Sequence, residues 1–395
     1  MSPSWAASGS TLRIAALFGA LFLATLDNQL LIPLLPTLGR EFSLGAQALG
    51  WLFGGYALAA ALFSLLFGPL TDRVGRTAFL KAGLLLIVLT SICTYFVTEF
   101  YQLLLLRILA GLGGGLLSTC TASLVGDRFS YESRGRVMGI VLSSYFVALI
   151  LGVPLAALVA ERWHWRGVFL FSGALAFLLF LLSALVLFGR PGPREGSDTN
   201  DLRNYRDLLA HATTRTAVLV SFGVSGATLA FLTFISKYLD ETFGLGPVEI
   251  SWLFLLAGVA AALSSPLAGW MSDRFSKRWI FLVFNTLLAL PLLLLTQVPW
   301  GGALLGTFFL ISLCIAFRQT ALQTLQTELV QEGRRGAFLA LRNAFSQLGI
   351  SVSVTVAGAL YAGAGYFAVT LWAVLLTLIS SILLYGAVEE PCSAK

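Results

Sequence analysis

One carboxylate in this chain lies deep inside a long apolar run, where acidic residues are rare. Asp27 is the only acid well inside the run 14–38. At about 1.5 Å per residue of helix, it lies roughly 20 Å along the run, near the middle of a bilayer. Burial favours the neutral form of a carboxyl group, so a carboxylate at this depth can take up and release a proton. We therefore expect Asp27 to carry protons.

A buried cation is the natural partner for such a carboxylate. Arg107 lies within the apolar run 100–126 and reaches a comparable depth from the opposite end of its run. One interpretation is that Arg107 keeps Asp27 ionised until a proton or a substrate intervenes. Two others remain open: a permanent structural pair, or an arginine whose head extends outward to the membrane surface. The first interpretation makes Asp27 and Arg107 the proton-coupling residues.

Two further arginines lie within apolar runs of the second half of the chain, and amide side chains follow each of them. Arginine with nearby amides suits a carboxylate, phosphate or sulfate, because the guanidinium presents a planar fork of donors. The alternative is that each arginine caps or pairs locally. The residues concerned are Arg318 with Gln319, Gln323 and Gln326, and Arg342 with Asn343 and Gln347.

The composition places these residues in a membrane protein. Hydrophobic residues make up 57% of the chain and charged residues only 11%, whereas soluble domains carry roughly 25% charged residues. The apolar runs are continuous rather than alternating, which indicates spanning helices and excludes a transmembrane barrel. The first run is longer than the core of a signal peptide and more runs follow, so we expect it to be retained.

No constellation of metal ligands or catalytic groups is visible. The four cysteines and two histidines lack metal-ligand spacing, and no nucleophile–base pair can be assembled from them. The net charge of +6 is explained by membrane orientation rather than by nucleic-acid binding. We therefore expect no enzyme activity, no cofactor, no metal and no nucleic-acid partner.

Twelve apolar runs are long enough to span a membrane, because about 20 residues of helix cross the hydrocarbon core. One polar segment, 190–214, separates the sixth run from the seventh, and a short surface helix is expected near 204–212. The predicted domains are a first six-helix bundle at 1–189, a cytoplasmic linker at 190–214 and a second bundle at 215–395. The runs are 14–38, 47–70, 78–97, 100–126, 135–160, 167–189, 215–238, 248–271, 279–297, 300–327, 335–362 and 365–387.

Positive charge predicts the orientation of these runs. Of the 25 Lys and Arg residues, Arg107, Arg318 and Arg342 lie well inside runs, and with the N-terminus inside only four lie in outer segments or at the outer ends of runs. The remaining eighteen then lie in cytoplasmic segments or at the cytoplasmic ends of runs, and an excess of basic residues marks the cytoplasmic side. We expect both termini to be cytoplasmic. The four outer residues are Arg40, Arg162, Arg166 and Lys237.

The two halves are related by a repeat. Asp72 and Asp273 are 201 residues apart (273 − 72), and four other matches of charged or glycine positions keep the same step. In transporters, internal repeats build two bundles around a site between them. The other matched positions are Gly68 with Gly269, Arg73 with Arg274, Asp127 with Glu328, and Arg134–Gly135 with Arg335–Gly336.

The repeated loops are expected to gate the cytoplasmic side. Asp72 can face the partly positive N-terminus of the run that begins at 335. Arg76 is expected to pair with Asp127, and Arg278 with Glu328. The alternative is that these charges only anchor the loops inside the cell. The predicted gating residues are Gly68, Asp72, Arg73, Gly75, Arg76, Asp127, Asp273, Arg274, Arg278 and Glu328.

These loops carry a family resemblance. Residues 68–76, Gly-Pro-Leu-Thr-Asp-Arg-Val-Gly-Arg, match the pattern Gly-x-x-x-Asp-Arg-x-Gly-Arg at every fixed position. Twelve runs in two halves with this loop resemble the major facilitator superfamily. The resemblance implies an all-α integral membrane fold of two pseudo-symmetric six-helix bundles. It also implies a monomer in the bacterial inner membrane.

Shorter motifs are similar to one group within that family. Residues 26–36 and the segment Leu106-Arg107-x3-Gly111 resemble the first and fourth helices of drug:proton antiporters. Gly152-Val153-Pro154 and Trp165-Arg166-x2-Phe169 resemble the arabinose-efflux-like exporters, although Val153 separates the Gly and Pro that are adjacent in the exporter motif. The resemblance implies multidrug-type efflux in exchange for protons.

We therefore predict a secondary active transporter that exports a small amphipathic organic compound or drug by proton antiport and alternating access. The alternative is a carrier or flippase for an anionic or lipid-like substrate recognised by Arg318 and Arg342. A membrane sensor or scaffold is disfavoured, because it needs no charges inside its spans. The predicted substrate cavity comprises Asn28, Tyr56, Tyr145, Arg318, Gln319, Gln323, Arg342, Asn343 and Gln347.

Overall fold

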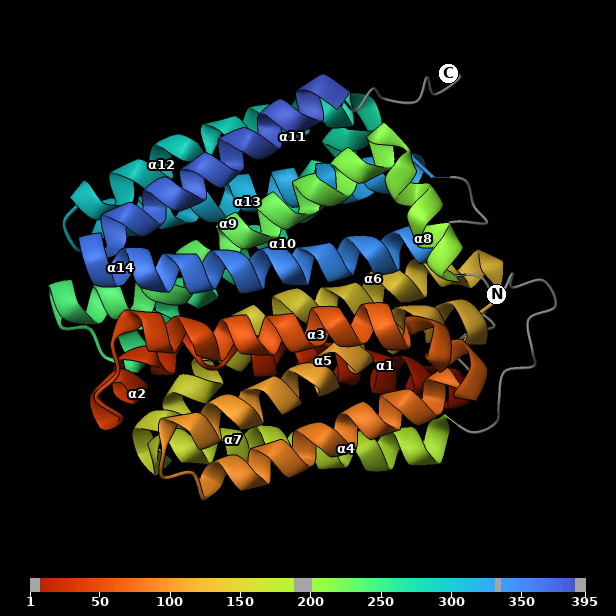
Figure 1. Cartoon of the computed structure of the whole chain (residues 1–395), viewed down its shortest axis with the longest axis horizontal. Helices are drawn as coiled ribbons and strands as arrows, with labels where there is room; N and C mark the ends of the chain where they lie inside the picture. The colour runs from red at the N-terminus through yellow and green to blue at the C-terminus, as the bar shows by residue number, and fades with distance from the viewer. Residues whose placement is uncertain (1–7, 188–200, 331–334, 388–395) are drawn as a thin grey trace. The chain divides into compact units, whose positions relative to one another are not determined.

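The computed structural model of the protein describes residues 8–187, 201–330 and 335–387, and every regular element in these ranges is helical (Figure 1). By length and composition, ten helices of the described ranges can cross a membrane. Two of the ten are more than 50 residues long and contain a break in helical geometry. Dividing each at its break gives the twelve spans that the sequence predicts.

The breaks explain where the long helices turn. Within α7 (Val153–Val186), Trp163 and His164 leave the helical conformation, and His164 has a φ of 64°. Within α14 (Arg335–Ala387), Gly365 has a φ of 74°, which only glycine adopts readily. The first break falls in the gap predicted between the runs 135–160 and 167–189, and the second falls at the first residue of the last predicted run, 365–387.

The described chain forms two compact units. Unit 1 comprises Met1–Leu31 with Gly55–Thr199, and unit 2 comprises Ile32–Gly54 with Asn200–Lys395. Residues 32–54 belong to unit 2, although the predicted first domain, 1–189, contains them. The predicted domain boundaries at 189 and 215 stay a prediction. Hydrogen bonds account for the place of 32–54: Ser236 Oγ donates to the Ile32 carbonyl at 2.5 Å, and Ser351 Oγ to the Gly54 carbonyl at 2.8 Å.

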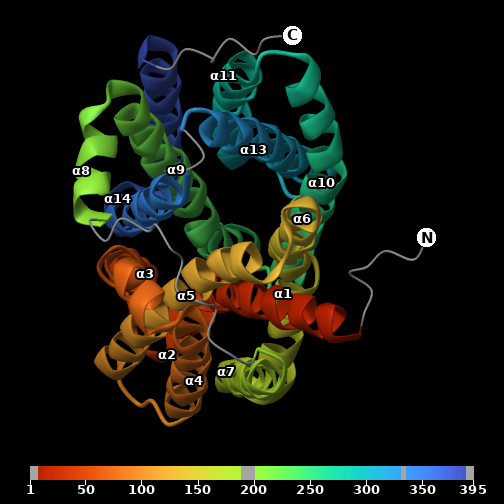
Figure 2. The ribbon, with the colours of Figure 1, turned by 90° about the vertical axis from the view of Figure 1, so that its right-hand side faces the viewer.

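Unit 1 is built around α1, α4, α5 and α7. In this unit α4 lies beside both α5 and α7 (Figure 2). Leu17, Leu84, Leu117 and Val141 are fully buried members of its apolar core. Its helices are α1 (Ser8–Gln29), most of α3 (Ala46–Val74), α4 (Arg76–Tyr95), α5 (Phe100–Arg128), α6 (Tyr131–Val147), the π-helical turn η2 (Ala148–Gly152) and α7.

Unit 2 is organised by α9, which packs along α14 (Figures 1 and 2). Its apolar core includes Val220, Phe281, Ala321 and Leu325. Its other helices are η1 (Ile32–Leu34), α2 (Leu35–Glu41), α8 (Asp201–Ala210), α9 (Ala212–Phe243), α10 (Pro247–Arg274), α11 (Lys277–Leu287), α12 (Ala289–Leu294), η3 (Leu295–Gln297) and α13 (Gly302–Glu328).

The first apolar run is not the single helix that the sequence predicts over 14–38. The helix α1 ends at Gln29, and the chain continues as the 3₁₀ turn η1 and the short helix α2. Pro33 and Pro36 explain the interruption, because proline lacks the N–H that an uninterrupted helix needs and crowds the preceding turn. Asp27 therefore lies in the last turn of α1.

The segment between the halves contains the predicted surface helix. It is α8, three residues earlier than expected at its start, and it is followed directly by α9. Residues 188–200 lie outside the described ranges.

Long apolar side chains are exposed on the spans, among them Leu185 at 69%, Leu263 at 71% and Ile382 at 69%. In a chain of this composition such surfaces face lipid rather than water.

Candidate functional site

The two charges predicted to lie at mid-membrane form a buried ion pair in unit 1. Arg107 Nη1 on α5 lies 3.2 Å from both carboxylate oxygens of Asp27 on α1. Arg107 Nη2 also donates to the backbone carbonyl of Asp27 at 2.7 Å. The side chains are 2% and 1% exposed. The arginine is thus held by one charged and one neutral acceptor of the same residue.

Aromatic rings complete the surroundings of this pair. The Arg107 guanidinium lies 4.6 Å from the centre of the Tyr56 ring and 5.9 Å from that of Phe169. The negative face of an aromatic ring attracts such a cation. Tyr56, predicted to line the cavity, is 2% exposed and belongs to this cluster.

The glycines of α5 make room for Tyr56. A Cβ at Gly111 would overlap the Tyr56 backbone, and a Cβ at Gly114 would overlap its hydroxyl. Small residues allow helices in lipid to approach closely. The glycine run therefore positions the ring against Arg107.

A π-helical turn packs next to Asp27. It spans Ala148–Gly152, ends two residues before Pro154, and contacts α1. A Cβ at Gly152 would lie 2.8 Å from a methyl carbon of Leu26, the neighbour of Asp27. Such turns recur at functional sites because they shift the helix register locally. The Gly152-Val153-Pro154 segment thus borders the end of α1 that carries Asp27.

Two predicted cavity residues of unit 1 are more open. Asn28 is half-buried, and Tyr145 on α6 is 41% exposed with its ring edge-on to Phe146. Their predicted contact with substrate stays a prediction.

A second buried arginine lies in unit 2, and its described partners are all neutral. Arg318 on α13 is 1% exposed. Its Nη1 donates to Asn285 Oδ1 at 2.7 Å, and its Nη2 to Thr228 Oγ1 at 2.5 Å and the Val224 carbonyl at 3.4 Å. Among the described residues, no acidic group lies within ion-pair distance of Arg318.

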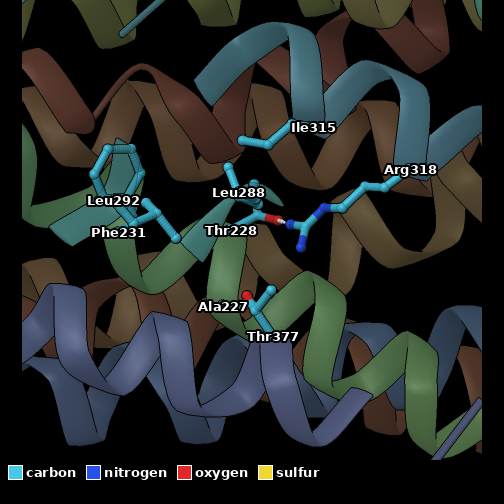
Figure 3. Close-up of a pocket in the computed structure, with 8 residues that line it drawn as sticks. All are labelled: Ala227, Thr228, Phe231, Leu288, Leu292, Ile315, Arg318 and Thr377. Carbon is cyan, nitrogen blue, oxygen red and sulfur yellow. Dashed lines mark hydrogen bonds between the residues drawn. The ribbon is translucent and has the colours of Figure 1, made fainter. Parts of the chain in front are cut away.

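Arg318 borders a small pocket within unit 2 (Figure 3). Its side chain extends from α13 toward Thr228, with Ile315 and Leu288 on one side and Thr377 on the other. In this conformation the space between the lining side chains is too narrow to admit a water molecule. The lining residues are Ala227, Thr228, Phe231, Leu288, Leu292, Ile315, Arg318 and Thr377. The pocket is therefore apolar apart from one charge and two hydroxyls.

The other predicted polar residues of unit 2 form a separate group around Arg342. Arg342 on α14 donates to Asn343 Oδ1 at 3.1 Å and to Gln326 Oε1 at 3.5 Å. Gln326 is 1% exposed and donates to the Ala217 carbonyl and Ser221 Oγ. Gln319, Gln323 and Gln347 are half-buried. Arg342 is thus engaged locally, which fits the alternative given for it above.

The predicted pair beside the first loop is present. Arg76 Nη1 lies 2.7 Å from both carboxylate oxygens of Asp127, with side chains 16% and 8% exposed. In the second half, the predicted ion pair between Arg278 and Glu328 is wrong. Lys277 Nζ instead pairs with Glu328 Oε2 at 3.3 Å. Arg278 instead donates to the Tyr385 carbonyl. The repeat itself names Lys277, which is 201 residues after Arg76 (277 − 76).

The two loops differ in backbone geometry. Gly75 begins α4 with a φ of 120°, which L side chains rarely adopt. Its counterpart Ser276 has a φ of −59° and caps α11 by accepting a hydrogen bond from the Trp279 N–H at 3.3 Å. The side chains of Asp72, Arg73 and Asp273, and the predicted contact of Asp72 with 334–336, lie outside the described residues. Arg274 is exposed and stacks on Trp270.

The family model of the Major Facilitator Superfamily matches the chain twice, over residues 17–245 and 217–395. The chain belongs to the major facilitator superfamily. It is therefore a multi-pass membrane transporter rather than an enzyme, with the fold of two related helical halves that the sequence predicts.

Curated relatives of this transporter are distant but cover nearly all of it. The "uncharacterized MFS-type transporter YwfA" of Bacillus subtilis is 26% identical over 95% of this chain and 93% of its own length. The "quinolone resistance protein NorA" of Staphylococcus aureus is 24% identical over 88% and 90% respectively. Both are bacterial, which is consistent with an inner-membrane location.

A solved structure confirms the fold of this transporter. A bacterial homologue of the human lysosomal transporter Spinster, in an inward-facing and occupied conformation, matches with a TM-score of 0.76 at 17% identity. The match covers 94% of this chain and 95% of that one.

Sequence reasoning missed two partners of Arg318. Asn285 is fully buried in the ninth predicted run, where an amide well inside an apolar run is a detectable signal. Thr228 lies 201 residues after Asp27 (228 − 27), so the repeat identifies it as the counterpart of the predicted proton carrier.

Proposed function

We propose that this transporter exports a small amphipathic organic compound in exchange for protons, and that Asp27 carries the proton. The observation that supports this most strongly is the Asp27–Arg107 pair, 1% and 2% exposed, in the last turn of α1. A carboxylate buried in the membrane is expensive to ionise without a partner, so its charge depends on that partner and on protonation. This dependence is the chemistry that proton coupling requires.

The geometry lets Arg107 remain in place when Asp27 changes charge. Protonation of the carboxyl group weakens the attraction to Nη1, but the bond from Nη2 to the Asp27 carbonyl does not depend on that charge. The ring of Tyr56 also stays beneath the guanidinium. A protonated Asp27 therefore leaves a buried, positively charged arginine with neutral acceptors only and no counter-charge, and that state is unfavourable.

This unfavourable state couples the proton to a change of conformation. In alternating access, two bundles rock to open a central site to either side, and the proton shifts their equilibrium only if it binds one conformation better. A state that admits water or substrate to Arg107 relieves its unpaired charge. Each proton that moves inward supplies about 2.3 kcal/mol per 100 mV and about 1.4 kcal/mol per pH unit.

The charged loops give the cytoplasmic side two links that can break and reform. Arg76–Asp127 and Lys277–Glu328 join neighbouring helices within units 1 and 2 respectively. Pairs that are partly exposed are worth only about 0–1 kcal/mol, so they can rearrange during each cycle. The distribution of Lys and Arg supports cytoplasmic termini, and hence a cytoplasmic place for these links.

The relatives support export as the direction. NorA is a quinolone resistance protein, and resistance by a transporter requires removal of the drug from the cell. The proposal extends the direction, but not the drug, to this transporter. We expect it to act as a monomer, without a cofactor.

The test uses inside-out vesicles that are acidic inside, with a pH-sensitive dye. Candidate compounds are added singly to vesicles of wild type, Asp27→Asn and Glu161→Gln. Glu161 is an exposed acid on α7 and serves as the matched control. A compound that makes the lumen more alkaline in wild type and the control, but not in Asp27→Asn, establishes proton antiport. Undiminished alkalinisation in Asp27→Asn contradicts the proposal.

A further inference from the structure

We infer that the pocket beside Arg318 is a binding site for an anionic group on the transported compound. The ligand class is a small apolar anion, in which one carboxylate or similar head group is attached to an aromatic or aliphatic body. The inference rests on the proposed function for the idea that the ligand is transported. Binding itself can be tested without it.

The charge of the buried Arg318 guanidinium supports an anionic ligand. Arg318 is 1% exposed, and its guanidinium has no acidic partner among the described residues. The described acids of unit 2 lie at or near the ends of its helices, namely Glu41, Asp207, Asp240, Glu241, Glu249 and Glu328. A buried charge without a counter-charge is strongly unfavourable in an apolar medium. An anionic ligand supplies the missing counter-charge.

An N–H donor of Arg318 that makes no hydrogen bond also supports an anionic ligand. A guanidinium has five N–H donors, and its Nε in Arg318 is buried without a hydrogen-bond partner. The Nη groups meet an amide oxygen, a hydroxyl and a distant carbonyl, none of which carries a full charge. A carboxylate presents two charged oxygens in a plane that matches the guanidinium fork. It is therefore a stronger acceptor than any group that now contacts Arg318.

Asn285 and Thr228 hold the Arg318 guanidinium in position. Asn285 Nδ2 donates to the Thr377 carbonyl at 2.7 Å and to Ser381 Oγ at 2.8 Å, which turns its Oδ1 toward Arg318. Thr228 fixes the other nitrogen (Figure 3). A head group that meets a positioned guanidinium loses less free energy to ordering than one that must organise a mobile side chain.

The side chains that line the pocket beside Arg318 are mostly apolar. Phe231, Leu288, Leu292 and Ile315 surround the approach to the charge with apolar carbon. In this conformation the space between these side chains is too narrow to admit a water molecule, so an anion reaches Arg318 only when the lining helices move apart. The apolar lining favours one head group with a small apolar part, and it disfavours a second charge on that part.

The experiment measures binding of a matched series to purified protein in uncharged detergent, by isothermal titration calorimetry without any proton gradient. Benzoate is the anion, benzamide its neutral analogue and benzylamine its cationic analogue. Dioctanoyl phosphatidate is added separately, because it distinguishes a lipid head group from a small organic anion. The proteins are wild type, Arg318→Gln and Arg342→Gln. Arg342 is the control, because it also lacks an acidic partner among the described residues but does not line the pocket.

We expect an anion from this series to bind wild type at least about tenfold more tightly than benzamide. Arg318→Gln should remove that preference, whereas Arg342→Gln should retain it. Binding of phosphatidate alone would identify the source as lipid while keeping the anion site. Equal affinity for the three benzene derivatives, no binding of either anion, or an unchanged preference in Arg318→Gln would overturn the inference.

A second variant guards against a folding defect in Arg318→Gln. Ala227→Leu fills the pocket from α9 and keeps the arginine, so it should weaken anion binding while circular dichroism stays unchanged. If Arg318→Gln does not fold, undiminished binding by Ala227→Leu overturns the inference. Asp27→Asn should bind the anion normally, so loss of proton coupling and loss of anion binding are separate outcomes.

Discussion

Each unit of this transporter buries one arginine almost completely, but the two arginines are neutralised differently. Arg107 in unit 1 faces the carboxylate of Asp27, whereas Arg318 in unit 2 faces the hydroxyl of Thr228 and the amide of Asn285. Thr228 lies 201 residues after Asp27 (228 − 27), so the repeat has a hydroxyl in one half where the other has a carboxylate. The first arginine is internally compensated, and the second retains its charge.

This difference suggests a division of roles between the halves. A compensated pair can change its net charge only by taking up or losing a proton, which suits coupling. An uncompensated arginine gains most from an external anion, which suits substrate recognition. Variants that change the charge around each arginine test this difference between the halves.

Removal of the arginine from the compensated pair should have the largest effect on stability. Arg107→Ala leaves the Asp27 carboxylate buried without a counter-charge, and breaking such a pair costs about 3–5 kcal/mol. We expect a large fall in thermal stability of the purified protein, measured by intrinsic fluorescence. The double variant Asp27→Leu with Arg107→Met removes both charges and should recover most of the loss. Equal instability of the double and single variants would show that the packing, not the charge, matters.

Introduction of a carboxylate into unit 2 should make it resemble unit 1. Thr228→Asp places an acid beside Arg318, and an internal carboxylate competes with any bound anion. We expect the affinity for benzoate to fall about tenfold or more. Thr228→Val removes the hydroxyl without adding charge and should retain binding in the same calorimetric assay. If Thr228→Asp binds benzoate as wild type does, Arg318 is not the group that recognises the anion.

Substitutions in the charged loops should have the smallest effects, and they should differ between the halves. Arg76→Ala removes a bidentate contact to Asp127, whose side chain is 8% exposed. Lys277→Ala removes a single contact to Glu328, which is 43% exposed. We expect losses of roughly 1 kcal/mol or less for Lys277 and somewhat more for Arg76, because screening by water weakens the exposed pair. Chemical denaturation of the two variants provides the comparison, and a larger loss for Lys277→Ala would contradict it.

The sequence predicts much of this arrangement because charges in apolar runs are conspicuous. Asp27 and Arg107 stand out as the rare charges of their runs, and the structure brings them into contact. The pair Arg76–Asp127 follows from the repeated loop in the same way. The twelve spans follow from the apolar runs, since lipid requires each of them to be helical.

Other features depend on information that a single run does not contain. The partners of Arg318 are uncharged residues, Asn285 and Thr228, and neutral polar residues are a weaker signal within a span than a charge, because they are more frequent there. The end of α1 at Gln29 required recognition that Pro33 and Pro36 act together. The exchange of Arg278 for Lys277 reflects a choice between adjacent basic residues, which only the register of the repeat resolves.

The central claim is that Asp27 couples transport to protons but is not needed for movement of the substrate itself. The most direct test compares two assays on Asp27→Asn in proteoliposomes, with a substrate identified by the vesicle screen. We predict that accumulation driven by a pH gradient is lost, whereas exchange of labelled for unlabelled substrate at equal pH continues at a rate close to that of wild type. Retention of gradient-driven accumulation in Asp27→Asn would contradict the claim.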